Sequence, residues 1–565
     1  FDTRSGSYGM SYLDYATPVN EPITKRFIYR HRLEKVNPNE TVSEAKEPIV
    51  YYLDRGTPEP IRSALLDGGR WWNQAFEAAG YKNAFQMKLL PEGADPLDVR
   101  YNMVQWVHRS TRGWSYGGSI SDPRTGEIIK GHVSLGSLRI RQDFLIAQAL
   151  QAPYRNNSSD DDFALQMALA RIRQLSAHEI GHTLGFAHNF AASTVNRSSV
   201  MDYPHPKFTL KYDKIDFSDA YDTKIGAWDK VIVAYSYQDF TDAENEAEQL
   251  NKILLDAYAS GLKYLSDSDA RSEGSASISA HLWDNGDNIQ DELDTLLKIR
   301  KTAIDHFSVD NIKTNEPYSV LEDVFVPLYF LHRFQTEAAV KIIGGLEYNY
   351  AVKDGNQTVV KRVSGEIERN ALQAVLKTIA VDEIAIPREK LALFPPRALG
   401  YGRTRESFNS KLGVEFDAFS AVETATEMTL NLLLNPQRAS RLIAHKSLDK
   451  NQLGLDELID ELIVKTIKKN HKDSYYQELQ NVINNQVLEQ LFNLAATENQ
   501  YKQVNAIVFF KLDEIKLILQ NKKSEGIQKI YDAAMIKMIE DFEKNPTSFK
   551  KLGVPQIPDG SPIGN

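Results

Sequence analysis

The sequence predicts an α+β protein, in which a twisted mixed β-sheet with one long helix precedes a large, mainly α-helical C-terminal region. Three features indicate this architecture. Short apolar strands separated by turns occupy much of the first 140 residues, a single long helical stretch follows at residues 163–182, and a 3.6-residue apolar period dominates beyond residue 215. A chain of 565 residues exceeds one ordinary hydrophobic core, so several domains are expected.

The chain divides where this pattern changes. Residues 1–47 are polar and rich in turn residues, and we interpret them as a lead-in or as the tail of an upstream domain. Residues 48–215 contain the sheet and the long helix. Residues 216–430 are expected to form a mainly helical domain that completes the cleft, and residues 431–565 a C-terminal helical bundle.

The expected sheet consists of short runs bounded by turn residues. Leu65, Trp72 and Phe76 recur on one side of residues 61–79, which predicts one helix that ends at Gly80. The predicted strands are residues 48–53, 85–90 and 100–108, then two extended pieces between residues 116 and 137 that are joined by a hairpin loop at residues 122–126.

Composition excludes several classes of protein. The formal net charge is −10, which argues against a nucleic-acid-binding protein. No apolar stretch approaches the length of a transmembrane helix, so no membrane-spanning segment is expected. The chain contains no cysteine, which excludes disulfides, thiolate metal sites and cysteine nucleophiles.

The most informative segment is residues 178–188. His178 and His182 are four residues apart, so on a helix both imidazoles leave the same face and can bind one Zn²⁺. Gly185 permits a left-handed turn that ends the helix and returns His188 as a third ligand. Glu179 lies beside the pair, within reach of a metal-bound water, and is the candidate general base. Three histidines leave a fourth position open, which is the pattern of a catalytic zinc site.

Residues 178–188 resemble HExxHxxGxxH, the signature of the metzincin metallopeptidases, and Ser199–Pro204 resembles the methionine-containing turn of that clan. The resemblance implies that Met201 forms a hydrophobic floor under the three histidines. It also implies that Tyr203 binds zinc at rest and swings away to stabilise the oxyanion, with a plain packing role as the alternative. Asn189 replaces the acidic residue that follows the third histidine in astacins, so that subfamily label does not carry over.

A narrower resemblance, over residues 50–450, is to the bacterial Met-zincin family of large zinc-dependent metalloproteins. It is carried by the segments 72–76, 225–230, 332–335 and 435–439. It implies that residues 48–215 are a metzincin-like catalytic domain. It also implies a secreted, periplasmic or cell-surface location in a Gram-negative bacterium.

The clan resemblance further implies that an extended peptide pairs with an edge strand above the zinc. We place that substrate-binding strand at Gly117, Gly118 and Ser119, where paired glycines let another backbone approach. The alternative is that the glycines only relieve a bend.

We therefore expect a zinc-dependent metalloendopeptidase that acts on a peptide or protein substrate. The alternatives are a metal-bearing binding or scaffold protein with an idle or latent centre, and a zinc amidase acting on a non-peptide bond. Oligomeric state is not predicted. Ca²⁺ is a weaker expectation, because the polar residues around Gly286 lack the spacing of a known calcium loop and a solvated turn is favoured. These residues are Asp284, Asn285, Asp287 and Asn288.

Overall fold

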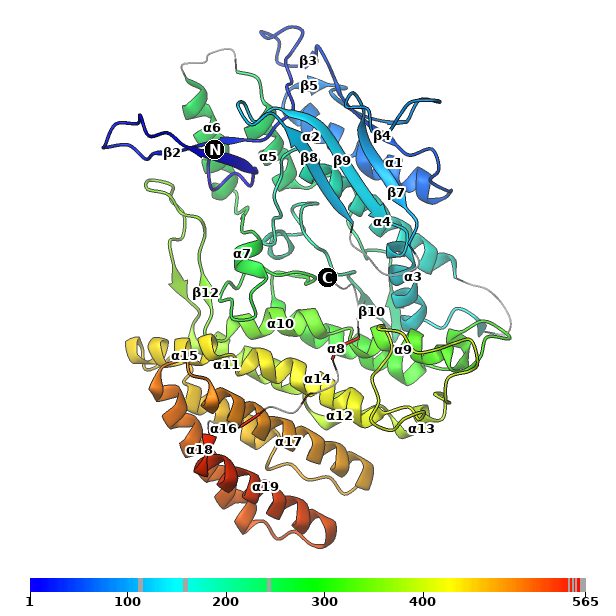
Figure 1. Cartoon of the computed structure of the whole chain (residues 1–565), viewed down its shortest axis with the longest axis vertical. Coiled ribbons are helices and arrows are strands. Elements are labelled where there is room, and N and C mark those ends of the chain that lie inside the picture. Colours follow the sequence, from blue (N-terminus) through cyan, green and yellow to red (C-terminus); the bar gives the residue numbers. More distant parts are fainter. Residues whose placement is uncertain are drawn as a thin grey trace.

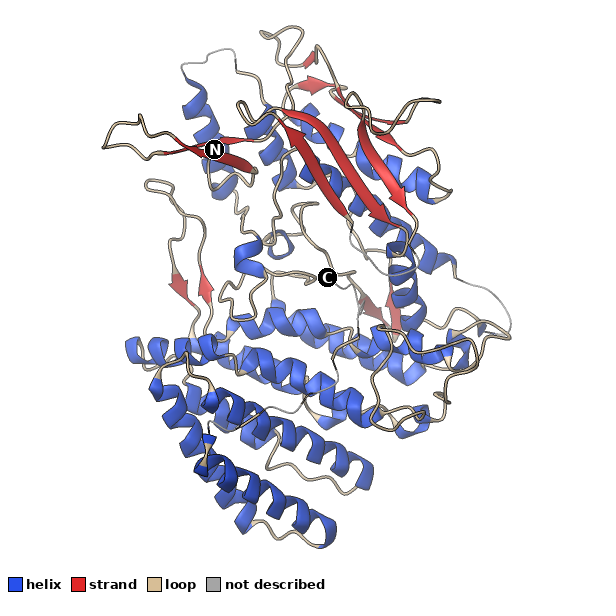
Figure 2. Cartoon of the chain, viewed as in Figure 1, coloured by secondary structure: helices blue, strands red, loops and turns tan. Residues whose placement is uncertain are grey.

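A five-stranded sheet dominates the first part of the chain in a computed structural model, which describes residues 1–109, 115–155, 161–240, 245–546, 549–550, 553 and 556–558. The strand order is β6-β4-β7-β9-β8. The first four strands are mutually parallel, and β8 pairs antiparallel with β9 at one edge. The strands are β4 (Ile49–Leu53), β6 (Phe85–Leu89), β7 (Asn102–Val107), β8 (Tyr116–Ser121) and β9 (Ile128–Gly136). The predicted mixed sheet is confirmed (Figures 1 and 2).

Helices α1 (Ile61–Arg70), α2 (Trp72–Ala78), α3 (Arg139–Leu150) and α4 (Asp162–Thr183) accompany the sheet. The prediction of one helix over residues 61–79 is wrong in detail. The backbone makes a tighter turn at Trp71, whose N–H donates to the carbonyl of Gly68, three residues earlier, and α2 begins afterwards. A Cβ at Gly68 would lie 2.0 Å from the Arg173 carbonyl oxygen, so this glycine allows α1 to pack directly on α4.

The N-terminal residues form part of this unit. Strands β1 (Gly9–Leu13) and β2 (Thr24–Ile28) make an antiparallel hairpin, and β3 (Ser43–Glu44) pairs with β5 (Tyr81–Lys82). The Tyr8 N–H donates to the Gly185 carbonyl at 2.7 Å, just past the end of α4. The lead-in predicted from the sequence therefore packs against the exit of the long helix.

The rest of the chain is mainly helical, as Figure 2 shows in its lower part. Two short hairpins, β10–β11 (Thr209–Lys211, Lys214–Asp216) and β12–β13 (Leu346–Glu347, Lys361–Arg362), interrupt it. Within the described residues, no helix is long and apolar enough to cross a bilayer. The helices are α5 (Ala227–Tyr237), α6 (Glu246–Ala259), α7 (Asp267–Ala270), α8 (Ile289–His306), α9 (Val320–Tyr329), α10 (Arg333–Ile342), α11 (Gly365–Lys377), α12 (Val381–Ile384), α13 (Arg388–Leu391), α14 (Ala418–Leu433), α15 (Pro436–Leu448), α16 (Leu455–Lys465), α17 (Ser474–Ala496), α18 (Lys502–Asn521) and α19 (Gly526–Lys544).

Three large apolar cores hold these layers together. The first lies between the sheet and α1, α2, α4 and α5, and includes Trp72 and Met201. The second joins α3 and the start of α4 to α8, α9 and the beginning of α14. The third runs from Ile289 in α8 to Phe542 in α19. The last helices therefore share a core with α8, α10 and α11. The division into domains at residues 215 and 430 stays a prediction.

Candidate metal centre

Helix α4 and the turn that follows it position three histidines. His178 and His182 lie in the last two turns of α4 and, being four residues apart, share one face. The helix ends at Thr183, and Gly185 takes a φ of +98°. A Cβ at Gly185 would lie 2.2 Å from the Tyr29 carbonyl oxygen, so only glycine fits this turn. The turn brings His188 back towards the helix.

The three imidazoles converge. The Nε2 of His182 lies 3.2 Å from that of His178 and 3.1 Å from that of His188. Among the described residues, these three form the one group of at least three His, Cys, Asp or Glu side chains whose ligand atoms could hold a metal ion. A tetrahedral zinc ion would hold its nitrogen ligands about 3.3 Å apart, so the spacing suits this ion.

Each Nδ1 atom faces an oxygen acceptor. His178 Nδ1 donates to the Val200 carbonyl at 2.7 Å, and His182 Nδ1 donates to the Phe186 carbonyl at 2.8 Å. His188 Nδ1 donates to Asp267 Oδ2 at 2.9 Å. Because oxygen acceptors place the proton on Nδ1 in each ring, all three Nε2 atoms present lone pairs to one point. Three facing lone pairs repel one another unless a cation lies between them, so the donor set fits a divalent metal.

Burial keeps the helical imidazoles neutral. It lowers the pKa of His178 well below its ordinary value, and the neighbouring His182 and His188 lower it further. Burial likewise lowers the pKa of His182 to about 3. Both rings are therefore uncharged at neutral pH, which is the form that binds a metal.

Met201 lies under the histidine-bearing helix. Its side chain is fully buried, and a Cβ at Gly181 would lie 2.2 Å from the Met201 sulfur. Asp229 holds the turn that presents it, because its carboxylate accepts Ser199 Oγ at 2.6 Å and the Val200 N–H at 2.9 Å. The sulfur and the backbone of α4 are therefore in close contact, where the clan resemblance implies a hydrophobic floor.

Comparison with known families agrees with this geometry. The sequence model of the Met-zincin family matches residues 160–474, which is more than half of the chain. The chain belongs to the Met-zincin family. No curated protein and no solved structure matches it. The matched residues of this Met-zincin include α4, the three histidines and the helices through α16.

Glu179 is buried beside the imidazoles. Its side chain is 5% exposed, and the Gly117 N–H on strand β8 donates to its carboxylate. Burial raises the pKa of Glu179 to about 8, although Arg171 and the Gly117 N–H act in the opposite direction. A carboxyl group with a pKa near neutrality can both accept and return a proton.

Tyr203 also reaches the cluster. Its ring centroid lies 5.3 Å from that of His178 and 4.7 Å from that of His188, and its ring stacks on Trp283 with a centroid distance of 4.7 Å. The Tyr203 hydroxyl accepts a hydrogen bond from Arg271 at 3.4 Å. Burial raises the pKa of Tyr203, so the hydroxyl keeps its proton at neutral pH.

Sequence reasoning missed Asp267 and Arg271 of this Met-zincin. Arg271 Nε lies 2.5 Å from Asp267 Oδ1. Within this ion pair, Asp267 contacts His188 and Arg271 contacts Tyr203. Their spacing of four residues is the one signal in the sequence, and it does not distinguish them from an ordinary surface ion pair. Their place beside the histidine cluster depends on tertiary packing.

Strand β8 lies at the edge of the sheet, where the substrate-binding strand is predicted. A Cβ at Gly117 would lie 2.2 Å from the Glu179 carbonyl oxygen, whereas a Cβ at Gly118 would meet nothing within 4 Å. Gly117 is therefore explained by the close approach of α4 to the strand. A role of Gly118 and Ser119 towards a substrate stays a prediction.

The polar residues around Gly286 form hydrogen bonds with separate parts of the protein. Asp284 accepts Ser193 Oγ at 3.0 Å, the Asn285 side-chain amide donates to the His205 carbonyl, and the Asn288 side chain caps α8. These contacts account for three of the four residues as parts of the protein framework. Calcium binding at this loop stays a prediction.

Proposed function

We propose that this Met-zincin is a zinc-dependent metalloendopeptidase, with His178, His182 and His188 as the zinc ligands. The observation that carries the proposal is the convergence of three Nε2 atoms next to the buried carboxyl group of Glu179. A bound zinc ion would supply Lewis acidity to a substrate carbonyl and acidify the attacking water.

Glu179 is proposed as the general base. It takes a proton from the attacking water and passes it to the nitrogen of the leaving amine, which its pKa of about 8 suits at neutral pH. The Tyr203 hydroxyl, which keeps its proton, is proposed to donate to the oxygen of the scissile carbonyl as charge develops there. Met201 is proposed to support α4 from below.

An extended substrate is proposed to lie along β8. The outer edge of this strand carries no further strand among the described residues, and its backbone reaches Glu179 through the Gly117 N–H. A peptide added to this edge would run past the imidazoles. A secreted, periplasmic or cell-surface location is proposed on the ground of the family resemblance.

The test measures zinc and cleavage separately. Purified protein should contain one zinc per chain and cleave a denatured protein substrate, and a chelator should stop cleavage. Glu179→Gln should keep the zinc and lose about 10²- to 10⁴-fold in the rate of peptide cleavage. The matched control is Glu92→Gln, because Glu92 is an exposed loop residue.

Other outcomes would favour the alternatives. Stoichiometric zinc without cleavage of any peptide in a broad library would favour a binding protein with an idle centre. Release of ammonia or an amine from non-peptide amides alone would favour an amidase. Equal cleavage by Glu179→Gln and the parent protein would remove Glu179 from the mechanism.

A further inference from the structure

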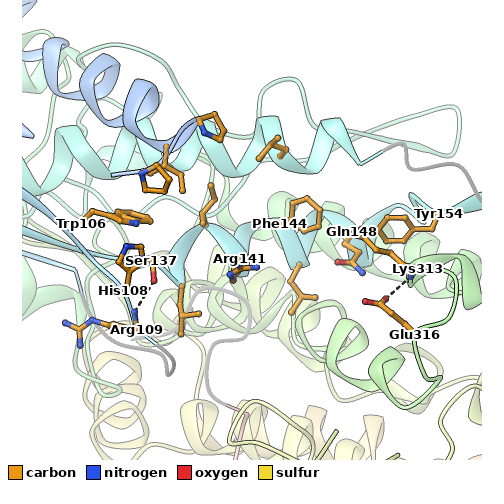
Figure 3. A pocket seen from close by; sticks show the side chains of 17 residues that line it. Trp106, His108, Arg109, Ser137, Arg141, Phe144, Gln148, Tyr154, Lys313 and Glu316 are labelled. Carbon is orange, nitrogen blue, oxygen red and sulfur yellow. Dashed lines mark hydrogen bonds between the residues drawn. The ribbon is translucent and has the colours of Figure 1, made fainter. Parts of the chain in front are cut away.

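A cavity of about 1040 Å³ lies at the carboxyl ends of three parallel strands, away from the histidine cluster (Figure 3). Its lining includes the residues that directly follow β7 and β9, namely His108, Arg109, Ser137 and Leu138. Pro58 and Pro60, which follow β4, complete this side. Ligands of α/β sheets bind outside the carboxyl ends of parallel strands, so this is a favourable place for a binding site.

This cavity is separate from the candidate metal centre. None of the residues assigned to that centre lines it. Leu165 is the α4 residue in its wall and precedes His178 by thirteen positions on the same helix. At 1.5 Å per residue, the two sites are about 20 Å apart along α4.

The wall of the cavity is largely apolar. Ile61 and Leu165 come from α1 and α4, Phe144 and Leu145 come from α3, and Trp106 comes from β7. These side chains offer a surface for an aromatic or aliphatic body, and the volume is that of a small-molecule site rather than of a packing defect.

The charged side chains of the lining are mostly basic. Arg109, Arg141 and Lys313 contribute three positive charges, and Glu316 contributes one negative charge. Figure 3 shows Arg109 at one end, Lys313 and Glu316 at the other, and Arg141 between them. Within the described part of the chain, neither Arg109 nor Arg141 forms an ion pair, although the whole protein carries a net charge of −10.

Two helices begin at the cavity, and the start of α3 adds to this positive potential. Pro60 precedes α1 and Leu138 precedes α3, and neither residue makes a side-chain capping bond. The first turn of each helix also lacks an acidic residue. The partial positive charge at the start of α3 is therefore not offset by a carboxylate in its first turn, whereas at the start of α1 the Glu59 carboxylate accepts the Ser63 N–H at 3.2 Å.

We propose that this cavity binds an organic anion with an apolar body, of the class of aromatic or long-chain carboxylates. The arginines Arg109 and Arg141 hold the anionic group, and the wall around Trp106 and Phe144 covers the apolar body. The proposal goes beyond peptide hydrolysis and does not depend on the metal centre.

The test compares two fluorescent probes that share one body. Anilinonaphthalene sulfonate carries an anionic group, and phenylnaphthylamine is the same ring system without it. The full-length protein should bind the sulfonate saturably, with one site per chain, and at least about tenfold more tightly than the neutral probe. Decanoate should displace the sulfonate. This comparison uses the unmodified protein, so it does not depend on how a variant folds.

Variants then locate the site. The double variant Arg109→Gln/Arg141→Gln should weaken sulfonate binding by about tenfold or more and leave binding of the neutral probe unchanged. The matched control is Arg26→Gln, because Arg26 is exposed on β2, outside the lining. The proposal is overturned if no saturable site appears, if both probes bind equally, or if the double variant binds the sulfonate as the parent does.

Discussion

Asp267 accepts a hydrogen bond from the Nδ1 of His188 at a distance of 2.9 Å. This contact joins the last of the three converging imidazoles to helix α7, 79 residues further along the chain. Arg271 pairs with the other carboxylate oxygen, and the His188 and Arg271 contacts together hold the pKa of Asp267 below its ordinary value despite partial burial. A second carboxylate of α7, Asp269, accepts the hydroxyl groups of Tyr348 and Tyr350.

Removal of this acceptor should weaken metal binding. In Asp267→Ala, His188 loses the partner that sets its tautomer and ring orientation, and zinc affinity should fall by about 10- to 100-fold. Competition with a chromogenic chelator measures this affinity without reference to activity. Asp256→Asn, in an exposed ion pair of α6, is the control. Parent-like affinity in Asp267→Ala would show that the contact does not position the imidazole.

Gly185 offers a test of the turn that returns His188. Gly185→Ala should destabilise the protein more than Gly261→Ala, although both glycines have a φ near +90°. A Cβ at Gly185 would lie 2.2 Å from the Tyr29 carbonyl oxygen, whereas a Cβ at Gly261 would meet nothing within 4 Å. The control should therefore cost about 1–2 kcal/mol for the left-handed backbone alone.

Chemical denaturation measures both variants, and the zinc affinity of Gly185→Ala should fall as well, because the turn carries His188. Equal unfolding free energies for the two variants would contradict the steric explanation.

Strand β8 can be tested at Ser119. The Gly117 N–H points to Glu179 and away from β9, and in an antiparallel pair the N–H two residues on leaves the same side of the strand. Ser119→Pro removes that N–H and should raise KM for peptides several-fold with little change in kcat. Ser119→Ala keeps the N–H and serves as the control. A KM that is the same in both variants would remove this edge from the substrate site.

Asp229 should give the stability of the protein a distinct pH dependence. Burial raises the pKa of Asp229 to about 6, so between about pH 4 and 6 the folded state binds more protons at this group than the unfolded chain does. The contribution of Asp229 to stability is therefore fully present at low pH. It falls by about 1.4 kcal/mol per pH unit as the pH rises through this window.

Between pH 4 and 7 the unfolding free energy of the parent should accordingly fall by up to about 3 kcal/mol relative to that of Asp229→Asn. Denaturant titrations at several pH values measure the difference, with Asp256→Asn as a control that shows no such trend. A constant difference across this range would contradict the raised pKa.

The parts that could be predicted from the sequence are those set by local geometry. Two local features determine the positions of the three imidazole rings, namely the four-residue spacing of His178 and His182 and the glycine at position 185. The three rings converge in the structure. The pairing of β8 with β9 also follows from a turn signal close in sequence, whereas the edge position of β8 is expected from the clan resemblance alone. The metzincin clan could be recognised because its signature is a short contiguous stretch, and the Met-zincin family because four further segments resemble it.

The remaining features depend on contacts between distant segments. Asp267 and Arg271 look like an ordinary helical ion pair until the fold brings them to His188 and Tyr203. The break between α1 and α2 at Trp71 could not be predicted, because the apolar spacing of residues 61–79 continues through it. The cavity at the ends of β7 and β9 gathers residues from five separate segments, none of which forms a motif.

The reach of α7 into the histidine cluster limits how the protein can be shortened. A recombinant fragment cut at residue 215 would retain every residue of the HExxHxxGxxH signature and lose the carboxylate that orients its final ring. Trimming at residue 271 would keep that carboxylate but remove Tyr348 and Tyr350, which anchor the helix that carries it. The smallest piece with a complete centre therefore extends past residue 350, well into the helical half of the polypeptide.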